Sequence, residues 1–309
     1  MPIKIESVNI SKKKGTIKHP VPEIELTLIG VKGDAHAGPW NRQVSLLGSE
    51  SIRKFEKETS RKIKPGEFAE NITTSGMRLW KSHPLDRFII NEVILEVTQI
   101  GKQCHGTSCT IFKEVGNCVM PKEGIFCRVI NPGILVPSMV MSYQPRSYKV
   151  NVITLSDRAS TGEYEDHSGP LIRALSEEFF RKQDLLSVIE YSLIPDDPDQ
   201  LGLLLKKSVE DKTDIIFTTG GTGIGPRDIT PDVISPMLDK EIPGIMDSIR
   251  LKYGSGNPNA LISRAVAGII DQSLIFTLPG SVKAVDEYFK EISKYILHLI
   301  YMFHGLEVH

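Results

Sequence analysis

Long apolar runs are absent from this chain of 309 residues: no stretch approaches the roughly 20 apolar residues that a membrane-spanning helix requires. The first residues, MPIKIESVNISKKKG, also lack the apolar core of a secretory signal. Hydrophobic residues make up 40% of the chain and charged residues 24%, as in soluble globular proteins. We therefore expect a cytoplasmic protein with no membrane partner.

Cysteine is absent from the C-terminal half, since Cys104, Cys109, Cys118 and Cys127 all lie in one short stretch of the N-terminal half. Catalysis by a thiol is therefore excluded from the C-terminal half. In a reducing compartment, clustered cysteines indicate metal or thiol chemistry more often than disulfides. The N-terminal half is where such chemistry is expected.

A large net charge is also absent, because the formal charge of the chain is -1. The charge is nevertheless uneven: residues 1–146 carry an excess of seven positive charges and residues 147–309 an excess of eight negative charges. A basic half could attract an anionic ligand and an acidic half a divalent metal, although random variation between two domains explains the pattern equally well. Basic residues that are scattered and not interleaved with aromatics predict no nucleic-acid partner.

The length predicts two domains, because it exceeds that of most single hydrophobic cores. The polar segment 142–149, which contains Pro145, separates two differently patterned regions, so we place the domains at residues 1–145 and 146–309. The first region has short β-type runs and about one helical stretch, which predict a mostly-β barrel or sandwich. The runs are at residues 24–30, 87–100 and 124–130, and the helix is at 49–62.

Strand and helix patterns alternate in the second region. This alternation predicts an α/β domain of three layers, in which helices cover both faces of a mostly parallel sheet. Apolar strands are expected at 150–156, 187–194, 214–221 and 273–280, and helices from Ser168 onward and at 199–211 and 284–303. Ligands bind at the carboxyl ends of the strands in such sheets, and the loops SDRAS, TTGGTG and LPGS lie at those ends.

The segment 218–232, TTGGTGIGPRDITPD, joins a buried strand to a helix that we expect to begin at Pro231 with Thr230 as its cap. Its glycines would let backbone N–H groups approach a phosphate, and its threonines would add hydroxyl donors. A structural tight turn explains such a loop as often, and no lysine follows the glycines as in G-x-x-x-x-G-K-[ST]. The ligand-facing candidates are Thr219, Gly220, Gly221, Thr222 and Gly223.

Charged residues beside these strand ends favour a phosphate site. Arg227 offers a cation to phosphate, and the neighbouring Asp228 offers a carboxylate to Mg²⁺. Asp196 and Asp157 follow two other strands, whereas Asp197 is better explained as the cap of the next helix. These residues predict a site for a phosphorylated ligand and a metal.

Five segments resemble the MogA family of molybdopterin adenylyltransferases, to which MoaB and gephyrin are related. They are VITLSDRASTGEYEDHSG, TTGGTGIGPRDITPD, EIPGIMDSIR, ALISRAVAG and LPGSVKAV, in the family's order and spacing, and the resemblance covers residues 148–309. It implies that ATP and molybdopterin react to adenylylated molybdopterin and pyrophosphate. It also implies a trimer and a separate molybdate-inserting protein or domain that acts next.

The resemblance assigns roles by motif position. Asp196 and Asp228 match the two family aspartates linked to catalysis, and they are our expected Mg²⁺ ligands. The residues that match the loop at the ligand site or line the pterin pocket are Gly220 to Gly223, Ser263, Arg264, Pro279, Gly280 and Ser281. The alternative is a protein that binds or carries the cofactor, or acts as a scaffold, without catalysis.

This residue set suits the reaction. The terminal phosphate of molybdopterin is already an anion at neutral pH, so the nucleophile needs little help from a base. Positioning and Mg²⁺ do most of the work in phosphoryl transfer, which explains why no Ser/His/Asp triad is found.

Three N-terminal segments look like a MOSC domain covering about residues 3–142: GDAHAGPWNRQVSLLGSESI, PGEFAENITTSG and LEVTQIGKQCHG. The resemblance implies one cysteine that carries sulfur, supplied by a cysteine desulfurase, or binds the cofactor, and Cys104 holds that position. Nearby Lys102 and His105 could lower its pKa. Arg42-Gln43 and Glu70-Asn71 are expected to face the pocket, with Arg42 suited to phosphate.

Two other interpretations remain open for these N-terminal residues. Cys104, His105, Cys109 and Cys118 could bind zinc, although their spacing matches no standard ligand set. Alternatively, the cysteines are small buried hydrophobes, which suits Cys127 in its apolar run. For His36 we favour a turn residue held by local hydrogen bonds over a ligand or base.

Overall fold

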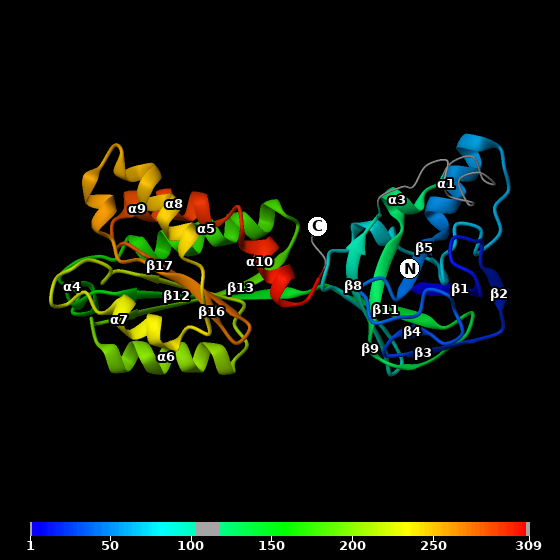
Figure 1. Cartoon of the computed structure of the whole chain (residues 1–309), viewed down its shortest axis with the longest axis horizontal. Helices are drawn as coiled ribbons and strands as arrows, with labels where there is room; N and C mark the ends of the chain where they lie inside the picture. Colours follow the sequence, from blue (N-terminus) through cyan, green and yellow to red (C-terminus); the bar gives the residue numbers. More distant parts are fainter. Residues whose placement is uncertain (1, 103–117, 307–309) are drawn as a thin grey trace. The chain divides into compact units, whose positions relative to one another are not determined.

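A computed structural model describes residues 2–102 and 118–306 (Figure 1). The chain divides into two compact units, the first ending at Arg146 and the second beginning at Ser147. Each unit has its own hydrophobic clusters. No helix among the residues that the model covers is long and apolar enough to cross a membrane.

The first unit is built on a closed barrel. Seven strands follow one another in the order β11-β7-β8-β9-β5-β6-β1, and pairing of Ile3 with Met141 joins β1 to β11 and closes the sheet. Closure leaves no open edge in this ring, so the predicted barrel is confirmed. The strands are β1 (Ile3–Ile10), β5 (Val44–Gly48), β6 (Ile72–Ser75), β7 (Arg87–Ile90), β8 (Val93–Ile100), β9 (Ile125–Asn131) and β11 (Val140–Gln144).

Smaller elements surround the barrel. Strand β2 (His19–Val21) pairs with β1, and β10 (Gly133–Leu135), β3 (Ile24–Thr27) and β4 (Gly30–Val31) form a second sheet. Helix α1 (Ser49–Thr59) packs Phe55 against Phe68 with ring centroids 5.1 Å apart. It ends before the predicted residue 62, because Ser60 adopts a left-handed conformation with φ of 55°. The short helices are η1 (Leu79–Lys81) and α3 (Met120–Glu123).

The second unit contains a six-stranded sheet in the order β13-β12-β14-β17-β16-β15. The first three pairs in this order are parallel and the last two are antiparallel. Strands β14 and β17 are buried at every residue, which explains their continuous apolar runs. The bounds are β12 (Ser147–Leu155), β13 (Leu186–Ile194), β14 (Ile215–Thr219), β15 (Lys240–Glu241), β16 (Ala267–Ile270) and β17 (Ser273–Leu278).

Helices lie on both faces of this sheet (Figure 1). Helices α5 (Ser168–Lys182), α8 (Pro243–Gly254) and α9 (Val282–Ile292) cover one face, and α6 (Pro198–Glu210) and α7 (Thr230–Ile234) cover the other. The remaining helical segments are α4 (Asp157–Ser160), η3 (Ser235–Met237), η4 (Pro258–Ile262) and α10 (Ile296–Phe303).

The single helix predicted at 284–303 was wrong, because α9 and α10 are separate helices. Between them, the backbone N–H groups of Lys294 and Tyr295 donate to carbonyls only three residues back, at Glu291 and Ile292. This tighter hydrogen bonding turns the chain at the end of α9. The apolar periodicity continues through the turn, so the pattern alone does not reveal the break.

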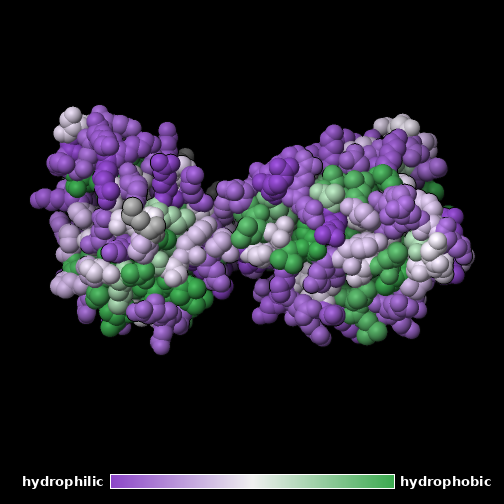
Figure 2. Space-filling model, turned by 180° about the vertical axis from the view of Figure 1, so that it is seen from behind, coloured by the Kyte–Doolittle hydropathy of each residue, from purple (hydrophilic) through white to green (hydrophobic). Residues whose placement is uncertain are grey.

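The surface of each unit is largely hydrophilic and is interrupted by apolar patches (Figure 2). In the second unit, the large hydrophobic side chains that are more than half exposed are Tyr164, Leu186, Val188, Leu203, Ile224, Leu251, Leu261 and Ile262. The structure identifies no partner for them, and the trimer implied by the resemblance stays a prediction.

Candidate functional site in the second unit

The predicted site residues meet at one edge of the second unit's sheet. Strands β12, β13, β14 and β17 run parallel, so their carboxyl ends lie together, and a loop follows each of them. Four loops, beginning at Ser156, Pro195, Gly220 and Pro279, therefore converge there. These loops carry most of the residues singled out from the sequence.

Two of the aspartates bind each other's loops. The backbone N–H of Asp157 donates to Oδ2 of Asp196 at 3.2 Å, and the backbone N–H of Asp196 donates to Oδ1 of Asp157 at 3.0 Å. These reciprocal bonds join the loop after β12 to the loop after β13. Asp197 caps α6 as predicted, since its carboxylate accepts from the N–H groups of Asp199 and Gln200.

Arg227 brings the loop after β14 into the same group by pairing with Oδ2 of Asp157. Its neighbour Asp228 accepts a 2.8 Å hydrogen bond from the N–H of Gly225. Burial raises the pKa of the Asp196 carboxyl, and the charges of Asp157 and Asp228 raise it further, while Arg227 opposes them. Asp157, Arg227 and Asp228 are therefore all close enough to Asp196 for their charges to act on it, and Arg227 pairs with Asp157.

The glycine loop is fixed by close contact between strand ends. Gly220 has φ of +97°, and a Cβ atom there would lie 2.2 Å from the carbonyl oxygen of Leu155. Its N–H already donates to the carbonyl of Leu278. Only glycine fits this position, and its role is to let β12, β14 and β17 end close together.

The hydroxyls of Thr219 and Thr230 form hydrogen bonds with backbone carbonyls of the protein. Thr219 donates to the carbonyl of Pro279 at 2.9 Å, and Thr230 donates to the carbonyl of Gly220 at 2.8 Å. The prediction that Thr230 caps the following helix was wrong, since α7 begins at Thr230 itself and its hydroxyl is used elsewhere. Thr222 is buried beside them.

Arg264 braces the loop after β14. Its guanidinium donates to the carbonyl of Gly223 at 2.6 Å, to Asp232 at 2.7 Å and to the carbonyl of Asp228. Its neighbour Ser263 accepts a hydrogen bond from the N–H of Ala265. The structure thus places Arg264 behind the glycine loop, where it holds Asp228 in position.

A cavity of about 490 Å³ adjoins these loops and contains residues that sequence reasoning missed. Its lining includes Gly280 and Ser281, and Ser281 also caps α9 through the N–H of Ala284. The missed residues are Thr154, Leu155, Ser156, Arg158, Ala159, Tyr164, Asp166, His167, Ser168 and Val282. Most of them lie in the segment SDRASTGEYEDHSG, whose several polar residues are the signal that could have found them.

Asp166 organises one wall of this cavity. Its carboxylate accepts a hydrogen bond at 2.9 Å from the N–H of Ser168, the first residue of α5. It also accepts one at 2.7 Å from the hydroxyl of Tyr191. Burial opposes the charge of Asp166, but hydrogen bonds from Tyr191 and Ser168 lower the pKa of its carboxyl. Burial and Asp166 together raise the pKa of Tyr191 to about 12.

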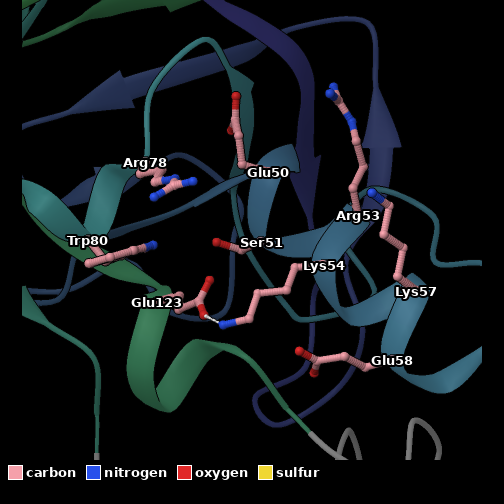
Figure 3. A pocket seen from close by; sticks show the side chains of 9 residues that line it. All are labelled: Glu50, Ser51, Arg53, Lys54, Lys57, Glu58, Arg78, Trp80 and Glu123. Carbon is pink, nitrogen blue, oxygen red and sulfur yellow. Dashed lines mark hydrogen bonds and ion pairs between the residues drawn. The ribbon is translucent and has the colours of Figure 1, made fainter.

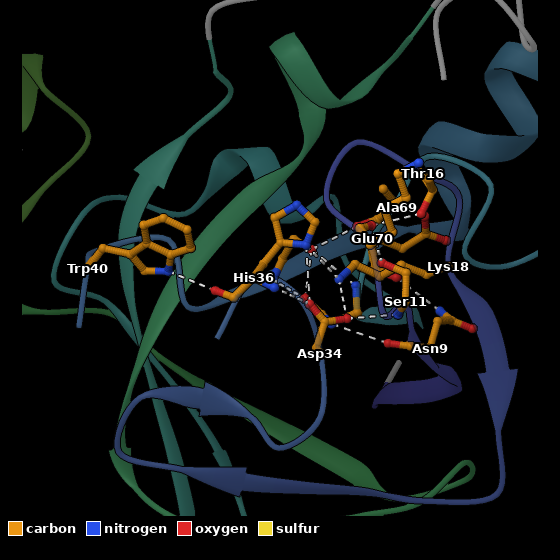
Figure 4. Close-up of polar contacts among 12 residues, drawn as sticks. Asn9, Ser11, Thr16, Lys18, Asp34, His36, Trp40, Ala69 and Glu70 are labelled. Atoms are coloured by element: carbon orange, nitrogen blue, oxygen red, sulfur yellow. Dashed lines mark hydrogen bonds and ion pairs between the residues drawn. The ribbon is translucent and has the colours of Figure 1, made fainter. Parts of the chain in front are cut away.

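The first unit contains a buried cluster of charged and polar side chains centred on Asp34 (Figure 4). Asp34 accepts from Lys18 Nζ at 2.5 Å, from Ser11 N at 3.0 Å and from Asn71 Nδ2 at 3.2 Å. The N–H and Nδ1 of His36 lie 2.9 and 3.2 Å from its other oxygen. These bonds match the turn role favoured for His36.

Burial sets the charge behaviour of this cluster. It lowers the pKa of Lys18 and raises that of Glu70, whose side chain is fully buried. For Asp34, burial opposes ionisation, but hydrogen bonds from His36 and Lys18 hold the pKa of its carboxyl well below the usual range. Oε2 of Glu70 has no hydrogen-bond partner among the described residues.

The residues expected at a MOSC pocket are not all brought together. Asn71 uses its side chain within the barrel, bonding Ser45, Asn9 and Asp34. Arg42 is exposed, whereas Gln43 is buried and accepts from the N–H of Val129. Cys104, His105 and Cys109 lie outside the described residues. Cys127 is a buried hydrophobe as predicted, and burial raises the pKa of its thiol.

A hollow of about 610 Å³ lies against α1 (Figure 3). It mixes charges of both signs, and Lys54 pairs with Glu123 across it at 2.7 Å. The mixture favours neither an anionic nor a cationic ligand. Within residues 2–102 and 118–306, no group of three or more His, Cys, Asp or Glu side chains is arranged to hold a metal ion.

Family models match both units of this chain. Residues 151–298 match the family model described as "Probable molybdopterin binding domain", and residues 33–137 match the MOSC domain. Molybdopterin adenylyltransferase of Pyrococcus furiosus is 37% identical over 161 residues, which are 50% of this chain and 91% of that protein. The chain belongs to the MogA/MoaB/gephyrin family.

Other family members match the same half of this MOSC-bearing chain. Gephyrin of Dictyostelium discoideum is 37% identical over 156 residues, which are 49% of this chain but only 22% of that protein. A solved structure of MogA is 32% identical, covers 50% of this chain and 99% of its own, and gives a TM-score of 0.46. The matches to the two family models and to the adenylyltransferase of Pyrococcus furiosus confirm both resemblances expected from the sequence.

Proposed function

We propose that the second unit is a molybdopterin adenylyltransferase in molybdenum cofactor biosynthesis. A phosphate oxygen of molybdopterin attacks the α-phosphorus of ATP, and the bond to the β-phosphate oxygen breaks. The products are adenylylated molybdopterin and pyrophosphate. The relatives named as molybdopterin adenylyltransferases support this reaction.

The observation that carries the proposal is the convergence of Asp157, Asp196, Arg227 and Asp228 beside the glycine loop. The reaction brings two anionic phosphates together, so it needs a cation and a rigid, water-poor cradle more than it needs a base. Arg227 is 64% exposed and can turn from Asp157 toward a phosphate. Arg264 and Gly220 hold the loop rigid.

The carboxylates fit a Mg²⁺ ion that arrives with ATP. Asp196 and Asp228 each engage one carboxylate oxygen in a backbone hydrogen bond, which leaves the other oxygen for a ligand. Mg²⁺ is commonly held by one or two carboxylates together with substrate phosphates and water. When bound, it would neutralise charge that develops on the phosphates. Its proximity would also relieve the repulsion between Asp196 and its acidic neighbours.

The test measures pyrophosphate released by the purified chain with ATP, Mg²⁺ and molybdopterin. Asp228→Ala is expected to abolish AMP transfer while leaving molybdopterin binding largely intact. Asp228→Asn sharpens the test, because it keeps an acceptor for the N–H of Gly225 and removes only the charge. Loss of at least about 100-fold in kcat is expected for both, as for other groups that act on a transferring phosphoryl.

The matched control is Asp197→Ser, which alters the residue beside Asp196 but keeps an N-cap for α6. It should transfer AMP at the wild-type rate. Wild-type turnover by Asp228→Asn would overturn the assignment of Asp228. No pyrophosphate from the wild-type chain, with molybdopterin bound, would favour the alternative of a non-catalytic carrier or scaffold.

For the first unit we propose that it binds the cofactor or carries sulfur through Cys104, as its MOSC match supports. Treatment with a cysteine desulfurase and cysteine, followed by mass spectrometry, separates the two. A mass increase of one sulfur atom that disappears in Cys104→Ala supports sulfur transfer. No increase, with cofactor binding intact, supports a carrier that delivers to a molybdate-inserting protein.

A further inference from the structure

Asp157 differs from the other aspartates of the transferase site in how its carboxylate is used. Oδ1 accepts from the N–H of Asp196, and Oδ2 pairs with Arg227, so both oxygens are engaged within the protein. Among the residues that the structure describes, Asp196 and Asp228 each accept a hydrogen bond through one carboxylate oxygen only. A carboxylate with both oxygens occupied is less suited to a ligand than one with a free oxygen.

Asp157 lies in the loop after β12 and contacts the loops after β13 and β14. It opens α4 directly after β12, and Ser156 fixes that turn by accepting from the N–H of Ala159 at 3.2 Å. Its backbone N–H and its carboxylate both bind the loop after β13, and its carboxylate also binds the loop after β14. In the described structure, no other side chain of this site bonds both of these loops.

We infer that Asp157 is a positioning residue that connects the loops after β13 and β14. Its bonds to Asp196 set the orientation of that residue, and its carboxylate holds Arg227 until the phosphates of ATP compete for the guanidinium. We call these contacts of Asp157 with Asp196 and Arg227 the clasp. This deepens the proposed function, on which it rests. Arg227 exchanges one anionic partner for another, so no proton or covalent bond changes. Asp157 itself contacts neither the metal nor the reacting phosphorus.

The geometry gives a physical reason for the role. Without the Asp157 carboxylate, the N–H of Asp196 loses its acceptor, and one of the two hydrogen bonds between Asp157 and Asp196 is lost. Asp196 would then be held to this loop through its carboxylate and no longer through its backbone N–H, so the orientation of the carboxylate would be less tightly fixed. A displacement of about 1 Å can cost about 100-fold in rate when the group positions a reacting phosphate.

The experiment compares Asp157→Ala with Asp157→Asn. Alanine removes the clasp, whereas asparagine keeps an acceptor for the N–H of Asp196 and removes the charge that holds Arg227. Three quantities are measured: kcat and KM for pyrophosphate release, the Mg²⁺ concentration for half-maximal rate, and amide hydrogen exchange of the peptide spanning residues 194–198. The exchange measurement needs neither substrate nor metal.

We expect Asp157→Ala to lower kcat by about 10- to 100-fold, the effect of losing one or two charged hydrogen bonds, with KM nearly unchanged. Amide exchange in 194–198 should become about tenfold faster. Asp157→Asn should restore slow exchange, the Mg²⁺ dependence and a kcat within about threefold of wild type. Rescue by asparagine is what a positioning role requires.

Two results would overturn the inference. If Asp157→Asn loses as much activity as Asp157→Ala while exchange stays slow, the charge of Asp157 acts on ligand or metal directly. If Asp157→Ala exchanges at the wild-type rate, there is no clasp. Should the alanine variant fail to fold, Asp157→Asn still tests the inference, because a loss of kcat of about tenfold or more with slow exchange would overturn it. A wild-type chain that releases no pyrophosphate refutes the proposed function. The amide exchange of residues 194–198 would still test whether Asp157 holds the loop after β13.

Discussion

Each unit has an ion pair within its main polar cluster, and the two pairs differ in burial. In the first unit, Lys18 and Asp34 form a pair whose side chains are each only 1% exposed. In the second, Arg227 and Asp157 form a pair whose side chains are 64% and 35% exposed. A buried charge that loses its partner is costly, whereas an exposed one is re-solvated by water. The first pair is therefore a permanent part of the barrel, and the second can be exchanged for a ligand.

The surroundings of each pair strengthen this contrast. Asp34 accepts from His36 in its own turn and from Ser11, Lys18 and Asn71 elsewhere in the chain, so it links distant parts of that unit. Asp157 links only loops that follow strand ends. Charge inside the barrel thus stabilises the fold, and charge at the sheet edge is available for chemistry.

The strongest test of the contrast replaces Lys18 by Met, which keeps the length of the side chain and removes its charge. Asp34 would stay buried without its cation, so we expect a loss of about 3–5 kcal/mol in the free energy of unfolding. Both tryptophans, Trp40 and Trp80, lie in the first unit, so their fluorescence in a urea titration reports that unit.

Lys32→Met is the matched control in the same unit. Lys32 pairs with Glu25 at 2.6 Å, but the two side chains are 65% and 49% exposed. We expect a loss of at most about 1 kcal/mol. Equal losses in the two variants would mean that burial does not distinguish the pairs, and the contrast would fail.

A smaller loss in the free energy of unfolding is expected when Tyr191 is replaced, whose hydroxyl donates to Asp166 in the second unit. Its pKa is raised to about 12 from 10.0, so the folded state holds the proton more tightly than the unfolded chain. The contribution to stability is therefore complete below pH 10 and is lost as pH rises through about 12. Tyr191→Phe should cost about 1–2 kcal/mol at neutral pH, and its difference from wild type should shrink between pH 10 and 12.

Urea titrations followed by circular dichroism measure this difference. Tyr164→Phe serves as the control, because Tyr164 is 52% exposed. It should match wild type at every pH. A Tyr191→Phe difference that does not change in the alkaline range would contradict the assigned role of this hydroxyl.

The smallest loss in the free energy of unfolding is expected for an exposed ion pair in the second unit. Arg173 and Glu177 lie one helical turn apart on α5, and both side chains are 54% exposed. Arg173→Ala should cost about 0.5 kcal/mol or less, and added salt should reduce even that. The urea midpoint measures it, and a loss above about 1 kcal/mol would show that exposure does not set the strength of these pairs.

Much of the second unit could be predicted because its signals are local. The apolar runs that became β12, β14 and β17, and the capping aspartate Asp197, depend on neighbours in the sequence. The break between α9 and α10 could not be predicted, because the apolar pattern runs across it. In the first unit the barrel class was predicted, but Lys18 and Asp34 gave no signal as a buried pair.

The sequence by itself determined the family, the strand ends and the residue types available at the site. The tertiary structure decided which of these groups meet, because hydrogen bonds between loops distant in sequence depend on how the strands are ordered in the sheet. In this structure, Arg264 and Thr230 donate to backbone carbonyls, and Asp196 and Asp228 each accept a backbone hydrogen bond through one carboxylate oxygen. The tertiary structure also placed Asp157 between two other loops, a role that residue type alone does not reveal.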